Sequence, residues 1–178
     1  MFISLQQLEQ RPVQFKVNLP AGEIEFDSKI TQSTVLHAEG AVNLLNHALG
    51  EIRVQGKLNV AVSATCDRCL EAASIAIDND FDLVYMPAGE SAVGEEEIDH
   101  EAIEVGFYEG NGLELNDVLR EIVLLALPMR VVCSEACKGI CPVCGRNRNQ
   151  TDCGCHEDAI DDRWSKLRSL KTEVGGQN

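Results

Sequence analysis

The sequence predicts an α+β fold. An antiparallel β-rich body, built as an open sheet or a partial barrel, carries one packed helix and is followed by a cysteine-rich segment that ends in a short helix. Three observations support this prediction: strand-like alternation over most of residues 1–86, helical apolar spacing at 115–127, and eight cysteines in four close pairs. We expect an acidic β-rich domain over residues 1–127 and a tail over residues 128–178.

Apolar residues recur at a spacing of two in two consecutive stretches, 52–62 and 75–85, with Gly56 in phase in the first. Because the stretches flank a cysteine pair, they predict an antiparallel hairpin with this pair at its turn. Weaker alternation suggests further strands at 13–17, 24–26 and 34–42, whereas residues 43–49 fit either a strand or a short helix.

Residues 87–112 are rich in glycine and glutamate, which predicts an acidic loop. Ile103, Val105 and Phe107 alternate within it and suggest a short edge strand. The apolar face of 115–127 predicts a helix buried against the sheet, with Asn116 or Asp117 as its cap and Pro128 as its stop. Residues 161–170 predict a short amphipathic helix at the end of the tail.

The four cysteine pairs predict metal binding. Two pairs supply four thiolates, which is the ligand set of a closed tetrahedral zinc site, so eight cysteines predict two structural Zn²⁺ ions. Such a site has no open position for a substrate or an activated water. The predicted ligands are Cys66, Cys69, Cys133, Cys137, Cys141, Cys144, Cys153 and Cys155.

Two groupings of these pairs are open. In the first, which we favour because 141–155 is compact, Cys66 and Cys69 join Cys133 and Cys137, and the remaining four form a local site. In the second, the cysteines from 133 to 144 form one site, and the first and last pairs form the other. His156 is an additional candidate that could replace a cysteine in the local site.

Other uses of the cysteines are disulfides, a redox motif or an iron–sulfur cluster. Disulfides need an oxidising compartment, but the N-terminal stretch has no secretory pattern and no apolar run is long enough to span a bilayer. We therefore expect a cytoplasmic protein that binds metal and does not act on a membrane.

The acidic residues are concentrated in one part of the chain. The net charge is −14; residues 1–127 hold 22 acidic against 7 basic residues, and residues 128–178 hold 7 against 8. Such a body should repel a phosphate backbone and attract a basic protein, although surplus carboxylates also simply maintain solubility. The basic residues of the tail could touch RNA.

Catalytic motifs are not evident. The sequence has no Ser/His/Asp arrangement, no phosphate-binding Gly–Lys loop and no HExxH motif. Its paired acidic residues fall in a predicted loop. We therefore expect a protein that is not an enzyme and has no small-molecule substrate.

The motifs CDRCLE at 66–71, CSEACKGICPVCGRN at 133–147 and DCGC at 152–155, followed by Trp164, Leu167 and Leu170, resemble the YceD family of large ribosomal RNA subunit accumulation proteins. One departure is Arg148, where the family more often has leucine. Some branches lack much of the 141–155 cluster, so the second site is expected mainly to stabilise the fold.

The resemblance implies a cytoplasmic, non-enzymatic factor for the accumulation or processing of large-subunit (23S) ribosomal RNA. The charge distribution adds the hypothesis that its partner is a basic large-subunit ribosomal protein, a 23S rRNA precursor or a pre-50S particle. The alternative is a zinc-stabilised adaptor for protein interactions unrelated to ribosomes.

Overall fold

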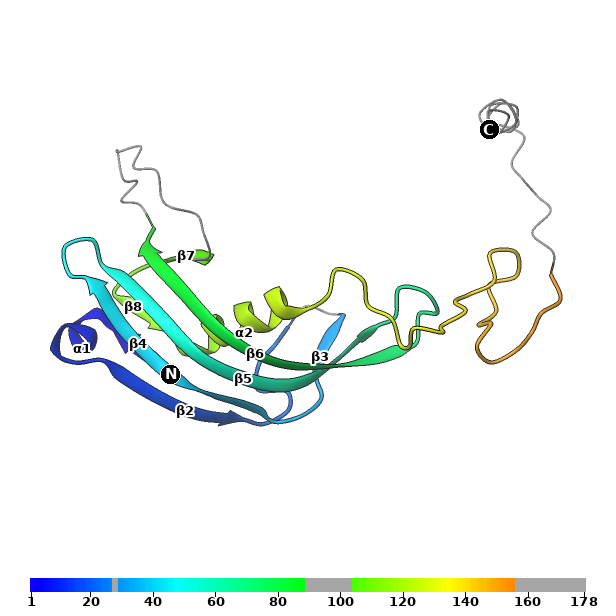
Figure 1. The fold of residues 1–178 in the computed structure, drawn as a ribbon, viewed down its shortest axis with the longest axis horizontal. Helices are drawn as coiled ribbons and strands as arrows, with labels where there is room; N and C mark the ends of the chain where they lie inside the picture. The colour runs from blue at the N-terminus through cyan, green and yellow to red at the C-terminus, as the bar shows by residue number, and fades with distance from the viewer. Residues whose placement is uncertain (27–28, 89–103, 156–178) are drawn as a thin grey trace, which may run out of the picture.

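One curved sheet dominates the protein (Figure 1). The computed structural model describes residues 1–26, 29–88 and 104–155. Within these residues, a six-stranded sheet has the order β2 (Val13–Leu19), β4 (Leu36–Asn46), β5 (Glu51–Thr65), β6 (Ala72–Pro87) and β7 (Glu104–Tyr108), with β3 (Ile30–Gln32) paired to the C-terminal part of β5. A two-stranded sheet joins β1 (Phe2–Ser4) to β8 (Gly112–Glu114), and the helices are α1 (Leu5–Gln10) and α2 (Leu115–Ala126).

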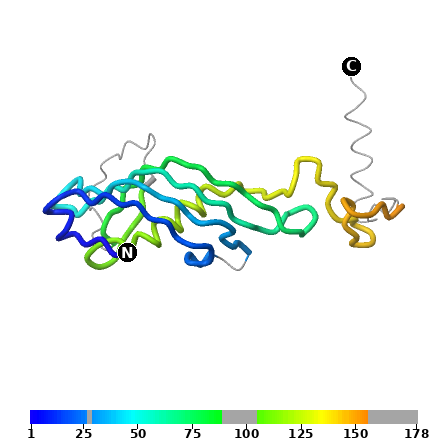
Figure 2. The backbone as a smooth tube through the Cα atoms, turned by 90° about the horizontal axis from the view of Figure 1, so that it is seen from below, coloured from blue at the N-terminus to red at the C-terminus, as the bar shows by residue number. Residues whose placement is uncertain are grey.

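The predicted long hairpin is confirmed by β5 and β6, which pair in antiparallel register from Ile52–Tyr85 to Thr65–Ala72. Their apolar residues face one side because successive strand residues point to opposite faces. The hairpin extends beyond the rest of the sheet, and its tip meets the cysteine-rich segment at one end of the elongated molecule (Figure 2). Among the described residues the sheet is open, with β2 and β7 as the ends of its strand order.

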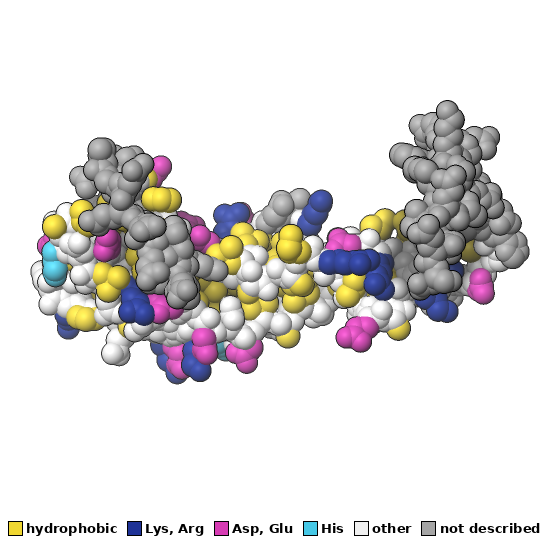
Figure 3. All heavy atoms as spheres, turned by 45° about the horizontal axis from the view of Figure 1, so that its top comes forward, with side chains coloured by type: hydrophobic (Ala, Val, Ile, Leu, Met, Phe, Trp, Pro, Cys, Tyr) yellow, Lys and Arg dark blue, Asp and Glu magenta, His cyan; other side chains and the backbone are white. Residues whose placement is uncertain are grey.

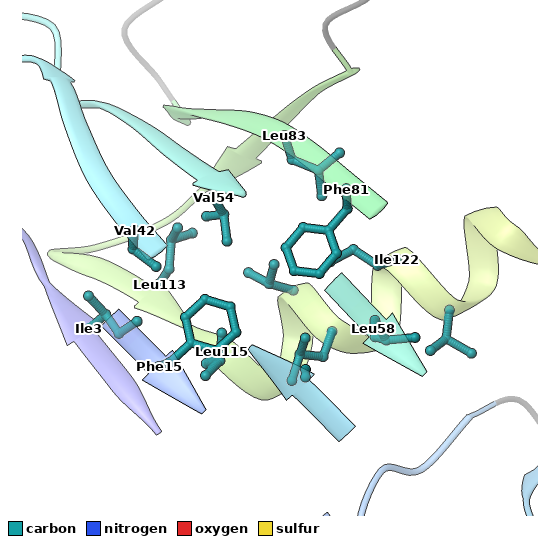
Figure 4. Close-up of a cluster of buried hydrophobic side chains, with 14 of the residues drawn as sticks. Ile3, Phe15, Val42, Val54, Leu58, Phe81, Leu83, Leu113, Leu115 and Ile122 are labelled. Carbon is teal, nitrogen blue, oxygen red and sulfur yellow. The ribbon is translucent and has the colours of Figure 1, made fainter. Parts of the chain in front are cut away.

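Helix α2 packs in the hollow of the curved sheet, as predicted for 115–127 (Figure 1). Its buried residues lie three or four positions apart, which places them along one side of the helix; they are Leu115, Val118, Leu119, Ile122 and Val123. In Figure 4, Leu115 and Ile122 lie among Phe15, Leu58 and Phe81 from the sheet. This cluster is the main hydrophobic core.

A row of paired residues crosses β2, β4, β5 and β6, and its two glycines allow the central strands β4 and β5 to approach each other closely. Phe15 pairs with Gly40, Gly40 with Gly56, and Gly56 with Phe81. A Cβ atom on Gly56 would lie 2.3 Å from the carbonyl oxygen of Glu39 and 2.9 Å from Cζ of Phe81. The two aromatic rings therefore occupy the space that side chains at the glycines would take, an arrangement that suits a strongly bent sheet.

Helix α1 was not predicted. Its cap is a reciprocal pair in which the Gln7 amide donates to the Ser4 hydroxyl oxygen and the Ser4 amide donates to the Gln7 side-chain oxygen. This capping box follows the S-x-x-Q pattern and was readable in the sequence. The predicted cap of α2 was wrong, because its N-cap residue is Glu114, without a side-chain cap bond. Instead, the Leu115 amide donates to the carbonyl oxygen of Met1.

Three strand predictions need correction. Residues 43–46 continue β4, so the helical alternative was wrong there, and 24–26 form no strand although Ile24 is buried in the core. The sheet is not wholly antiparallel, since β7 pairs with β6 in parallel. β7 confirms the suggested edge strand within 87–112.

The predicted helix at 161–170 and the acidic stretch 89–103 lie outside the described residues. No helix in the described part of the chain is long and apolar enough to cross a membrane. The predicted division into domains at residue 127 stays a prediction.

Candidate metal centre

The turn of the β5–β6 hairpin presents the first cysteine pair. The Cys66 amide donates to the carbonyl oxygen of Glu71 at 2.8 Å, and the Leu70 amide donates to that of Cys66 at 2.9 Å. Leu70 adopts a positive φ of 63°, which closes the turn within a few residues. Both Cys66 and Cys69 are buried.

The chain after α2 returns to this turn and brings the second pair. The Asp67 amide donates to the carbonyl oxygen of Val131 at 2.8 Å, and the Val131 amide donates to the Asp67 carboxylate at 2.7 Å. The Arg68 guanidinium donates to the carbonyl oxygens of Glu135 and Cys137 at 3.2 and 3.0 Å. These contacts position the next two cysteines beside the hairpin turn.

The first cysteine cluster, defined as Cys66, Cys69, Cys133 and Cys137, has all four sulfurs within 4.8 Å of one another. The Cys66 and Cys137 sulfurs are 3.9 Å apart, and those of Cys69 and Cys133 are 3.6 Å apart. A tetrahedral ion with metal–sulfur bonds of about 2.3 Å requires sulfur–sulfur separations of about 3.8 Å. The residues therefore fit a four-thiolate metal ion, and all eight cysteines are free of disulfides.

The second cysteine cluster, defined as Cys141, Cys144, Cys153 and Cys155, is local and more exposed, and its sulfurs also lie within 4.8 Å of one another. Its first turn is closed by the Cys141 amide donating to the Arg146 carbonyl oxygen, and by the Gly145 amide donating to that of Cys141. Gly145 has a φ of 72°, a conformation that favours glycine.

The two clusters are joined by hydrogen bonds. The Asn149 side chain accepts from the Lys138 amide at 2.7 Å and donates to the Cys137 sulfur at 3.3 Å. The Ile140 amide donates to the carbonyl oxygen of Arg68 at 2.9 Å. Glu71 on the hairpin accepts from the side chains of Asn147 and Gln150. Contacts of this kind orient metal ligands and place charge near their sulfurs.

The four thiols of the first cluster differ in acidity. The backbone N–H of Cys69, with other amides, lowers the pKa of Cys66 to about 6 against the opposing effect of burial. The Asn149 amide lowers the pKa of Cys137. The backbone amide of Glu71 lowers the pKa of Cys69. Burial and hydrogen bonds to the other three sulfurs outweigh this effect and raise that pKa to about 12. The neighbouring Cys137 raises the pKa of Cys133.

The second cluster shows the same contrast. The amides of Cys144 and Val143 lower the pKa of Cys141 to about 6, whereas the sulfurs of Cys144 and Cys153 raise that of Cys155 to about 12. A cluster of close thiols thus loses its first proton readily and its last with difficulty. The reason is that the negative charge of each thiolate disfavours deprotonation of the neighbouring thiols. A divalent cation among the sulfurs would remove this opposition and stabilise the fully deprotonated set.

Metal affinity of the first cluster should increase steeply with pH. A thiol must be deprotonated to bind an ion, and Cys69 and Cys133, whose pKa values are raised, keep their protons near neutral pH. Binding should therefore release at least two protons, so the affinity should increase at least about 100-fold per pH unit between pH 6.5 and 8. Competition with a chromophoric chelator at several pH values, in a Cys155→Ser variant, measures this slope. A pH-independent affinity would show that the four thiols do not act together.

The Asn149→Ala substitution should weaken metal retention by the first cluster about 10- to 100-fold, the effect typical of residues that hydrogen-bond to metal ligands. Its physical basis is loss of the donor to the Cys137 sulfur and of the acceptor for the Lys138 amide. The rate of metal release to excess chelator measures it. The neighbouring exposed Thr151→Ala provides the matched control, and equal release rates in both variants would contradict this role of Asn149.

The structure therefore brings together the sulfurs of the first predicted grouping and not those of the second. That these eight residues bind metal stays a prediction, and His156 lies outside the described residues. Sequence reasoning did not identify the supporting roles of Asn149 and Arg68. The role of Asn149 could be found from the sequence, because it is an amide side chain shortly after a cysteine motif. The role of Arg68 could not, because it depends on a contact between distant parts of the chain.

The sequence profile described as large ribosomal RNA subunit accumulation protein YceD matches residues 54–171, which include most of the β5–β6 hairpin and every cysteine. The chain belongs to the YceD family. This confirms the resemblance drawn from the cysteine motifs. The family name links its members to accumulation of large-subunit ribosomal RNA.

A YceD-family relative in Arabidopsis thaliana is named "Large ribosomal RNA subunit accumulation protein YCED homolog 1, chloroplastic". It is 23% identical over 153 residues, which cover 70% of this chain and 46% of the relative. The chain thus spans about half the length of that relative. No solved structure matches the chain significantly.

Proposed function

We propose that this YceD-family protein is a non-enzymatic ribosome-biogenesis factor that supports accumulation or processing of large-subunit (23S) rRNA. It would do so by binding a basic large-subunit ribosomal protein or a pre-50S particle. The observation that carries the proposal is the family match over residues 54–171. The cysteine clusters support it, since four-ligand sites suit a structural ion and leave no position for a substrate.

We further propose that each cluster holds one Zn²⁺ ion. Four cysteine ligands at tetrahedral spacing suit zinc, and the ion's role would be to fix the hairpin and the tail together. The free cysteines also favour a cytoplasmic location, where thiols stay reduced.

The distribution of charge along the chain supports two regions of contact with ribosomal components, one acidic and one basic. The excess of carboxylates in residues 1–127 favours a basic partner through long-range attraction. Figure 3 shows lysine and arginine side chains near the cysteine-rich end of the molecule, where Arg68, Lys138 and Arg146 belong to the turns around the two clusters. These residues provide a place for contact with rRNA phosphates.

Affinity purification of the full chain from growing cells at low salt tests the function. We expect enrichment of a 23S precursor or a basic large-subunit protein, together with about two zinc ions per chain. An unrelated acidic protein of similar net charge serves as control for non-specific attraction. Zinc without ribosomal components would favour the alternative adaptor role and contradict the proposal.

A further inference from the structure

The middle of β6 has an open edge. β5 pairs with β6 along its length, but β7 pairs only with Leu83–Pro87. Within the described ranges no strand pairs with the other side of residues 76–82. Every second residue of an antiparallel strand directs its N–H and C=O groups away from its partner. Residues 76–82, here called the β6 edge, therefore present backbone groups that an added strand could pair with.

The two sides of the β6 edge differ chemically. Asp78, Asp80 and Asp82 alternate along it and are exposed, so their carboxylates share one face of the sheet. A groove of about 260 Å³ lies between β6 and α2. Asn79, Asp80 and Asp82 line its β6 side together with buried Phe81, and Leu125 and Ala126 of α2 give it an apolar wall. Leu125 is 57% exposed, although it stands on the helix that covers the core.

This pattern specifies the kind of strand that would fit. Side chains of an added strand would alternate between the carboxylate face and the groove, since the strand period is two. Lys57 and Arg53 already pair with Asp80 and Asp82, but these pairs are exposed and leave Asp78 as an additional negative charge. An occupant with basic residues at alternate positions and apolar residues between them is complementary to both faces.

We propose that the β6 edge and its groove bind an extended protein segment of alternating basic and apolar residues, which adds to the sheet as a strand beside β6. The inference rests on the proposed function, because it names the place at which a basic protein partner would dock. A second copy of this chain fits poorly, since two β6 edges side by side would bring their aspartates together, and like charges across strands are destabilising.

The test uses the full, metal-loaded chain and two labelled peptides of about ten residues, one alternating lysine and valine and one with the same residues in blocks. We expect the alternating peptide to bind at least about fivefold more tightly by fluorescence anisotropy, and to slow amide exchange in residues 76–82. Asp78→Lys, which reverses a charge, and Leu125→Gln, which removes the apolar contact without a charge change, should each weaken its binding about fivefold or more. Glu9→Lys on α1 makes the same charge change away from β6 and should have no such effect.

Equal binding of both peptides, or equal weakening by Glu9→Lys and Asp78→Lys, would show non-specific attraction and overturn the proposal. A dimer of the full chain that Leu125→Gln dissociates would identify a second copy as the occupant and also overturn it. Repeating the affinity purification with the Asp78→Lys, Leu125→Gln chain separates the two proposals. Recovery of ribosomal components by the wild type but not by this variant supports both, whereas equal recovery rejects the docking site and leaves the proposed function intact.

Discussion

The Cys66→Ser variant should retain only about one metal ion per chain and lose about 2–5 kcal/mol of unfolding free energy, the range found when a long-range cross-link is removed. Cys66 has no exposed surface, and its cluster links the hairpin turn to the chain after α2. Metal binding contributes directly to folding where the ligands are brought together only in the folded state. Thermal unfolding with metal analysis measures both effects, and the midpoint should fall by roughly 5–15 °C.

Cys155→Ser is the matched control for this prediction. It also removes one thiolate from a group of four, but Cys155 is exposed and its cluster joins residues close together in the chain. Its midpoint should therefore fall less, because a short closed loop restricts the unfolded chain less than a long one. Equal decreases in both variants, or a decrease only in Cys155→Ser, would contradict the cross-linking role of the first cluster.

A second large effect is expected for Gly56→Ala, which should cost about 3 kcal/mol because it forces two central strands apart. The added methyl group would meet the backbone oxygen of Glu39 at 2.3 Å, and a backbone atom in the middle of a sheet cannot move away cheaply. It would also displace the Phe81 ring from the core. Chemical denaturation, with the free energy extrapolated to water, measures the loss.

Gly110→Ala is the control for the intrinsic effect of replacing glycine. Gly110 has a φ of 80°, and an added Cβ would meet nothing within 4 Å. Its cost should be limited to about 1–2 kcal/mol of left-handed backbone strain. If Gly56→Ala were no more destabilising than Gly110→Ala, close approach of the strands would not be the reason for glycine in the central row.

The parts of the fold that could be predicted depend on local pattern. The β5–β6 hairpin follows from apolar spacing of two on both sides of a cysteine turn, and α2 follows from its apolar stripe. The grouping of the cysteines was also predictable, because residues 141–155 are close enough in sequence to form a cluster of their own. In each case, neighbouring residues determine the geometry.

The parts that could not be predicted depend on pairing between distant segments. The parallel pairing of β7 with β6 and the antiparallel pairing of β1 with β8 leave little trace in the sequence, because β1, β7 and β8 are short. The starting residue of α2 is likewise determined by the backbone of Met1 and not by a capping side chain. The hydrogen bond from the Asn149 side chain to the Cys137 sulfur depends on the folded geometry of two separate turns.

The span of the first cluster also imposes an order on events during synthesis. Cys66 and Cys137 are 71 residues apart in the chain. At a translation rate of about 5–20 residues per second, Cys137 is synthesised roughly 4–14 seconds after Cys66. The second cluster lies within one short stretch and can be completed soon after it is translated. Nascent chains thus pass through a period in which one reactive dithiol turn is exposed to cellular oxidants and competing metals.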